Sequence, residues 1–171
     1  MKKLLTIFFV CCLVGFLALY LRASPSLARE QLEQKVFAYP IHYAKERCKK
    51  DHGYTDEDVN LMEKELKRYF LMILLKEAND PPIGMYSKHV DDLWHSFILF
   101  TREYQHFCLS TAGYFIHHAP EMDLERSIEG FAKKKDEYRM FIETYEKIFN
   151  EEIHPIWLLD SVEKTEGTSL R

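Results

Sequence analysis

The sequence predicts an all-α protein: an N-terminal transmembrane or signal-anchor helix followed by a compact bundle of about four main helices. Only 6 glycines and 6 prolines occur among 171 residues, which leaves few turn residues for a β-sandwich or a barrel. A hydrophobic content of 47% argues against disorder. Apolar residues recur at intervals of three and four over long stretches, as in helices with one buried face.

The chain begins with a candidate membrane segment. Lys2 and Lys3 precede residues 4–21, a run without charged side chains that is just long enough to cross a hydrocarbon core of about 30 Å. We expect residues 1–22 to anchor a single-pass membrane protein whose domain lies on the non-cytoplasmic side. The alternative is a signal peptide cleaved near Ala28, which would give a secreted or periplasmic protein.

The charge of the remaining chain disfavours nucleic acid as a partner. The formal net charge is -4, but Lys2, Lys3 and Arg22 are basic and no acidic residue precedes residue 29. Residues 29–171 therefore carry 20 basic and 27 acidic side chains. A domain of this sign repels a phosphate backbone unless its cations gather on one face. We expect the membrane, through residues 4–21, to be a partner, and the sequence identifies no protein partner.

Residues 23–54 are expected to form two juxtamembrane helices. Pro40 separates them, because proline breaks or kinks a helix. Gly53 stands where a glycine commonly ends a helix. We assign the helical domain proper to residues 55–160 and a flexible tail to residues 161–171.

The first long helix of the domain is expected to begin at Thr55, a suitable N-cap followed by three acidic residues at the positive end of the helix dipole. It should run to residue 79, where Asp80 and two prolines stop it. Its apolar stripe predicts that the charged side chains off the stripe are exposed: Glu63, Glu65, Lys67 and Lys76.

Two further long helices are expected. Ser87 is a plausible N-cap for a helix that runs without interruption to residue 111, and Asp123 can cap a last one that ends near residue 150. The apolar residues 154–159 should dock back onto the bundle.

Ligand-type side chains concentrate in residues 87–120. Asp91 and His95 are four apart, so they project from one face of a helix. Gly113 permits a turn that would return His117 and His118 to this face. These four residues could hold a divalent metal such as zinc and leave positions open for water.

A structural interpretation of the same motif carries more weight. Asp91 lies in the first turns of a helix, where negative charge is favoured in any case, and His95 can bond a backbone carbonyl. No H-E-x-x-H motif, the usual pair of zinc-binding histidines on one helix, is present. In this interpretation the motif fixes a helix and a turn through structural residues: Trp94, Tyr104, Cys108 and Gly113.

Cys48 and Cys108 are the only cysteines after residue 22. In an oxidising compartment they could form a disulfide, whereas in the cytosol they would be buried thiols.

The chain resembles the glycine-rich domain-containing protein-like family over residues 50–152. The resemblance rests on an ordered set of motifs: Glu65-x-x-x-Tyr69-Phe70, Val90-Asp91-x-x-Trp94-His95, Thr101-Arg102-x-Tyr104, Phe107-Cys108, Gly113, His117-His118-x-Pro120 and the stretch 138–149. It implies a helical fold more than an activity. Phe97 stands where the family usually has a further histidine, so one candidate metal donor is missing. Functions tied to a glycine-rich region are not expected here.

Two functions remain open from the sequence. The leading hypothesis is a membrane-tethered helical binding or interaction module without enzymatic activity. The alternative is a metal-dependent, hydrolase-like enzyme that uses Asp91, His95, His117 and His118. No catalytic residue is assigned.

Overall fold

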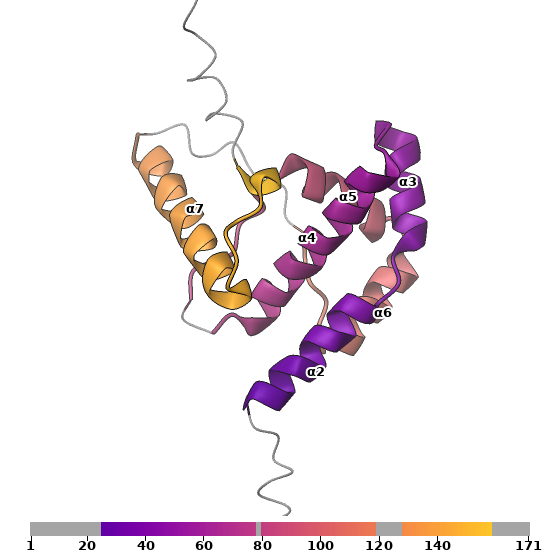
Figure 1. The fold of residues 1–171 in the computed structure, drawn as a ribbon, viewed down its shortest axis with the longest axis horizontal. Coiled ribbons are helices and arrows are strands. Elements are labelled where there is room, and N and C mark those ends of the chain that lie inside the picture. Colours follow the sequence, from indigo (N-terminus) through magenta and orange to yellow (C-terminus); the bar gives the residue numbers. More distant parts are fainter. Residues whose placement is uncertain (1–24, 78–79, 119–127, 159–171) are drawn as a thin grey trace, which may run out of the picture.

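A computed structural model of the protein describes residues 25–77, 80–118 and 128–158, with side chains in the last stretch described from residue 134 onward. All regular structure in these residues is helical, which confirms the all-α part of the predicted fold class (Figure 1). The elements are α2 (Pro25–Ala38), α3 (His42–His52), α4 (Asp56–Leu75), α5 (Lys88–Ile98), α6 (Thr101–Thr111), α7 (Ile128–Phe149) and the short 3-10 helix η1 (Pro155–Trp157).

The membrane segment stays a prediction. Among the helices that the structure describes, none is both long and apolar enough to span a bilayer. The expected anchor at residues 4–21, the N-cap at Asp123 and the tail at residues 161–171 lie outside the described residues.

Helices α2 and α3 belong to the same hydrophobic core as the later helices. The chain breaks between them around Pro40, as predicted, and Gly53 ends α3 in the left-handed conformation with φ 78°. However, Val36 and Ala44 are fully buried in the core that α4 and α5 also form. The predicted boundary at residue 54 therefore lies within one hydrophobic core, which residues on both sides of it share.

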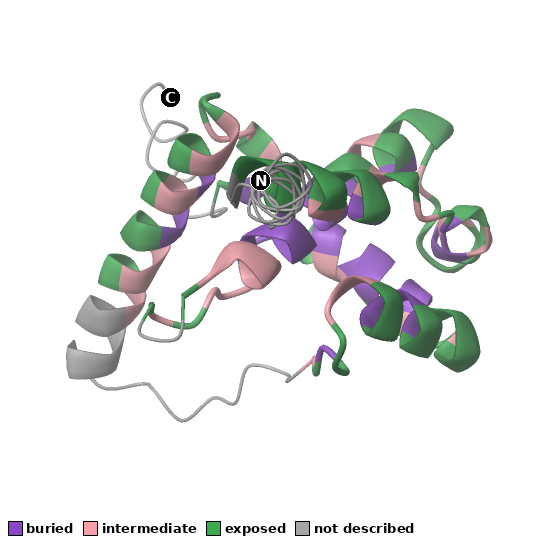
Figure 2. Ribbon diagram, turned by 90° about the horizontal axis from the view of Figure 1, so that it is seen from below, coloured by how far each residue is buried: buried purple, intermediate pink, exposed green. Residues whose placement is uncertain are grey.

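Helix α4 runs through the middle of the fold, with α7 on one side and α3 and α6 on the other (Figure 1). Thr55 caps its start as predicted, and with Asp58 it forms a reciprocal capping box. It ends at Leu75, a turn earlier than predicted, because Lys76 is already extended and the Asp80 carboxylate accepts a hydrogen bond from the Glu77 N–H at 2.8 Å. Figure 2 shows the buried residues on the inward faces of the helices.

Two charged residues of α4 were wrongly expected on the surface. Glu65 is 0% exposed and Lys67 is 7% exposed. The Lys67 ammonium donates to the Phe37 carbonyl at 2.9 Å and to Glu63 at 2.7 Å. The prediction assumed that α4 buries only one apolar face. In the structure other parts of the chain cover more than one of its faces, so these charged side chains are buried as well.

The buried Glu65 carboxylate joins three segments. The Tyr145 hydroxyl from α7 and the indole N–H of Trp157 each donate to Oε2 at 2.8 Å. The Arg68 guanidinium lies 3.5 Å from Oε1 and also donates to the Tyr145 oxygen. Trp157 is 0% exposed, so the prediction that residues 154–159 dock back onto the bundle is confirmed over the described part of that segment.

The helix expected over residues 87–111 is interrupted at Leu99 and Phe100. The Phe100 N–H bonds the Phe97 carbonyl, three residues back, and Phe100 then leaves the helical conformation. The break lets Trp94 Nε1 donate to the Tyr104 hydroxyl at 3.1 Å. In a continuous helix these residues would be about 15 Å apart along the axis, so the aromatic contacts between α5 and α6 require the interruption.

Replacing Glu65 by alanine should lower the free energy of unfolding by about 3 to 5 kcal/mol, because Arg68 and the donors on Tyr145 and Trp157 would lose their buried acceptor. Denaturant unfolding followed by tryptophan fluorescence measures the change. Glu57→Ala, at an exposed glutamate in the first turn of the same helix, is the control and should cost no more than about 1 kcal/mol. Equal losses in the two variants would contradict the role assigned to Glu65.

Candidate functional site

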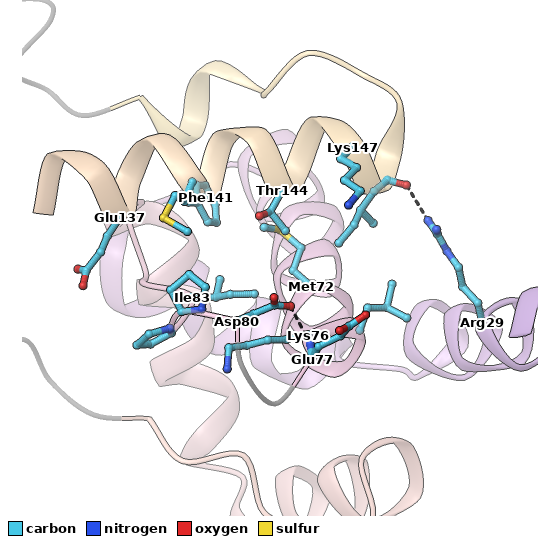
Figure 3. A pocket seen from close by; sticks show the side chains of 15 residues that line it. Arg29, Met72, Lys76, Glu77, Asp80, Ile83, Glu137, Phe141, Thr144 and Lys147 are labelled. Atoms are coloured by element: carbon cyan, nitrogen blue, oxygen red, sulfur yellow. Dashed lines mark hydrogen bonds between the residues drawn. The ribbon is translucent and has the colours of Figure 1, made fainter. Parts of the chain in front are cut away.

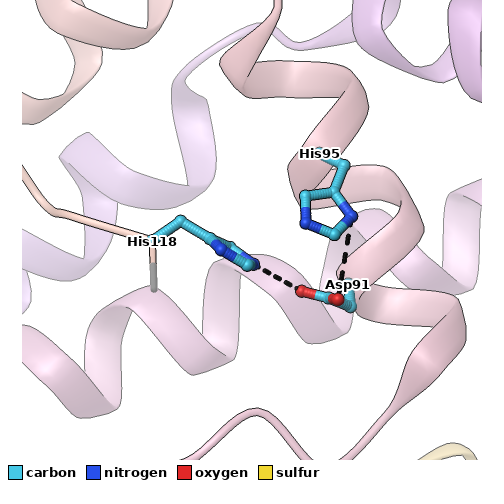
Figure 4. Close-up of side chains that lie close together, drawn as sticks. All are labelled: Asp91, His95 and His118. Carbon is cyan, nitrogen blue, oxygen red and sulfur yellow. Dashed lines mark hydrogen bonds and ion pairs between the residues drawn. The ribbon is translucent and has the colours of Figure 1, made fainter. Parts of the chain in front are cut away.

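Asp91, His95 and His118 meet at the surface between α5 and the segment after α6 (Figure 4). His118 Nε2 lies 2.7 Å from Asp91 Oδ1, and His95 Nδ1 lies 3.7 Å from Asp91 Oδ2. The two imidazole rings are 4.5 Å apart between centroids. The carboxylate thus contacts both histidines.

The local fold explains how this group forms. The Ser87 hydroxyl accepts a hydrogen bond from the Val90 N–H and starts α5, which places Asp91 and His95 one turn apart. Gly113, with φ 77°, turns the chain after α6. These two features bring the returning segment alongside α5.

Tyr104 holds the returning segment in place. Its hydroxyl accepts from Trp94 Nε1 and donates to the Ile116 carbonyl at 2.6 Å. His118, two residues further on, packs against the Trp94 ring with the ring centroids 4.4 Å apart. Trp94 and Tyr104, two of the residues named as structural in the sequence, therefore position His118.

The three side chains of the Asp91 group differ in how far solvent reaches them. The side chain of His118 is 12% exposed and that of Asp91 26%, whereas that of His95 is 55% exposed. A ligand approaching from solvent would reach the site past His95.

The donor set suits a divalent transition metal. One ligand atom from each of the three residues lies within 4.8 Å of the others. Zinc bound to imidazole nitrogen and carboxylate oxygen at about 2.0 to 2.2 Å in a tetrahedral site requires ligand atoms about 3.3 Å apart. The two histidine nitrogens lie 2.7 and 3.7 Å from different oxygens of Asp91, and the three ligand atoms spread over up to 4.8 Å, so the side chains would have to shift for one ion to contact all three.

The same geometry also forms a clamp without any ion. When Nε2 of His118 carries a proton it donates to Asp91, and this bond fastens the segment after Gly113 to α5. The structural interpretation therefore rests on this bond, and the metal interpretation on the whole group of three.

His117 does not join the group. It is exposed, and its ring packs against Phe115 at 5.1 Å between centroids. Of the two adjacent histidines, His118 bonds Asp91, whereas His117 lies exposed outside the group. Three of the four candidate ligands are thus brought together.

Asp92 forms a second cluster that the sequence analysis missed. Its Oδ2 accepts from the Tyr54 hydroxyl at 2.8 Å and from the Lys88 ammonium at 2.7 Å, and lies 3.8 Å from His52 Nδ1. Burial raises the pKa of Asp92, but the bonds from Lys88 and Tyr54 outweigh it, so the pKa is lowered overall. Lys88, four residues before Asp92, was the available sequence signal for an ion pair.

Cys48 and Cys108 are both free and fully buried, so the disulfide offered by the sequence is not formed. Cys48 lies beside Ser96 of α5, whereas Cys108 lies beside Tyr104 and the Ile116 backbone. Burial raises the pKa of both thiols, which makes them unreactive core side chains.

The Asp92 cluster should make stability depend on pH. The folded-state pKa of Asp92 lies below its ordinary value of 3.8. The bonds to its ionised carboxylate therefore stabilise the folded protein fully above pH 3.8, and this stabilisation is lost as the pH falls through the folded-state pKa. Tyr54→Phe should therefore cost about 1 to 2 kcal/mol at neutral pH, with a smaller cost in strong acid. Urea denaturation at several pH values measures this, with the exposed Tyr114→Phe as control. A cost independent of pH would show that the effect does not pass through the carboxylate.

Comparison with known proteins gives one match. The model of the family described as UCP032817-like matches residues 29–164. No curated protein and no solved structure matches the chain. The match does not bear on the resemblance to the glycine-rich domain-containing protein-like family or on an activity. It spans most of the chain, from within α2 through α7 and η1. By this match, the protein is a member of the UCP032817-like family.

Proposed function

We propose that this protein is a membrane-tethered, non-enzymatic binding module that holds one divalent transition metal ion, with zinc as the best fit, at Asp91, His95 and His118. The observation that carries the proposal is the convergence of three ligand atoms within 4.8 Å from two separate segments. Imidazole and carboxylate are a common donor set for zinc. The tether is the predicted anchor at residues 4–21.

The ion would fasten the segment that follows Gly113 to α5. Two ligands come from α5 and one from the returning segment, so a bound ion crosslinks the two. Metal binding of this kind contributes directly to folding free energy. Water or a ligand from a partner would complete the coordination on the exposed side, at His95.

The alternative of a metal-dependent hydrolase has one observation in its favour. The open position beside His95 could hold a water molecule whose pKa the metal lowers, which is the nucleophile of such enzymes. Against it, the cavity between α4 and α7 is lined by none of the three ligands. A binding role is therefore the better supported of the two.

The purified full chain, made without tag histidines and without chelator, should bind about one zinc ion per chain. Isothermal titration calorimetry and elemental analysis measure this. His118→Ala and Asp91→Asn should each weaken zinc binding by at least about 100-fold, because each removes a ligand from a site with only three. His117→Ala is the matched control, since the adjacent histidine lies outside the group, and should bind zinc like the unaltered protein.

Equal losses in the His117→Ala and His118→Ala variants would contradict the assigned ligand set. Absence of zinc binding, together with destabilisation by His118→Ala, would leave the clamp as the sole role of the motif. Chelator-sensitive hydrolysis of ester or phosphoester test substrates, lost in His95→Ala, would favour the enzyme instead.

A further inference from the structure

A second site lies between α4, the connector at residues 80–83 and α7, away from the Asp91 group (Figure 3). Its cavity has a volume of about 370 Å³, within the range of small-molecule pockets. Apolar side chains form much of its lining: Met72, Leu75, Ile83, Met140, Phe141 and Ile148.

The walls of the cavity are fixed by hydrogen bonds. The Tyr69 hydroxyl donates to the Ile83 carbonyl at 3.0 Å and holds the connector against α4. At one end, the Arg29 guanidinium donates to the Ile148 carbonyl at 2.6 Å and joins α2 to α7 (Figure 3). The cavity is therefore preformed, which lowers the entropic cost of filling it.

Opposite charges face each other across the mouth. Thr144 and Lys147 extend from α7, and the Asp80 carboxylate faces them from the connector (Figure 3). Among the described residues, Lys147 has no ion-pair or hydrogen-bond partner. Asp80 accepts from the Glu77 N–H, which leaves further acceptor capacity on its carboxylate.

This arrangement selects a class of ligand. The lining carries three basic and three acidic side chains, so a ligand with charge of one sign alone does not match it: Arg29, Lys76, Lys147, Glu77, Asp80 and Glu137. A purely apolar ligand would leave the charged groups at the mouth without partners. A molecule with an ammonium group, a carboxylate and apolar side groups matches all three features of the cavity.

We propose that the cavity between α4 and α7 binds a zwitterionic ligand with apolar side groups, of the size of an apolar dipeptide. Its ammonium group bonds the Asp80 carboxylate, and its carboxylate bonds the Lys147 ammonium and the Thr144 hydroxyl. The apolar groups pack against Met72 and Phe141. The site is independent of the proposed metal, since it shares no residue with the Asp91 group.

The test titrates the full chain with four probes in a calorimeter: leucyl-leucine, its N-acetyl form, its C-terminal amide and glycyl-glycine. Leucyl-leucine should bind at one site. Loss of either charge, or of the apolar side chains, should weaken binding about tenfold or more, because each removes a charge-assisted hydrogen bond or apolar contact. No binding of leucyl-leucine at millimolar concentration, or equal binding of all four probes, would overturn the proposal.

Two variants test which charged group of the ligand each of Lys147 and Asp80 binds. Lys147→Gln should remove the preference for leucyl-leucine over its amide, and Asp80→Asn should remove the preference over the N-acetyl form. The asparagine keeps an oxygen that can accept from the Glu77 N–H, so the connector is preserved. Lys135→Gln, at an exposed lysine of α7 outside the cavity, is the matched control and should bind like the unaltered chain. Unchanged preferences in the Lys147 and Asp80 variants would contradict the assignment.

Discussion

The buried carboxylate of Glu65 is the constraint on which the arrangement of α7 depends. An ionised group removed from water costs several kcal/mol unless its partners satisfy it. Tyr145 and Trp157 both donate to one of its oxygens, and Arg68 lies near the other. These donors come from α7 and from the segment that follows it, so the carboxylate is satisfied only when both are docked. The cavity between α4 and α7 exists because that docking fixes the distance between the two helices.

Tyr69 links the two candidate sites. Its ring packs against Trp94 at 5.3 Å and against Trp157 at 6.0 Å between centroids. Its hydroxyl holds the connector that forms one wall of the cavity. Burial, and then the nearby charge of Asp91, raises the pKa of Tyr69, which keeps the hydroxyl protonated as a donor. One side chain of α4 thus contacts the motif tryptophan, the docked C-terminal segment and the cavity wall.

Features set by local chemistry could be predicted from the sequence, whereas features set by packing could not. The cap at Thr55, the glycine at the end of α3 and the docking of Trp157 follow from residue types and their order. The burial of Glu65 could not be foreseen, because an apolar stripe assumes a helix with one buried face. The break at Leu99 was hidden because Thr101 and Tyr104 continue the periodicity of α5. Likewise, nothing in the sequence distinguishes His117 from His118, since the choice depends on the path of the chain after Gly113, which the packing against Trp94 and Tyr104 sets.

In the proposed metal site, the two residues of the clamp, Asp91 and His118, would also be ligands of the ion. An ion entering the group must displace the hydrogen bond between them. A hydrogen bond to a charged group is worth about 1.5 to 3 kcal/mol, whereas zinc bound by a complete structural site in a small domain contributes about 10 to 16 kcal/mol. In the proposed site, the lost hydrogen bond would therefore cost less than such an ion contributes in a complete site. The clamp would therefore not oppose the proposed metal binding; because it holds His118 beside Asp91, it would reduce the entropy lost on binding an ion.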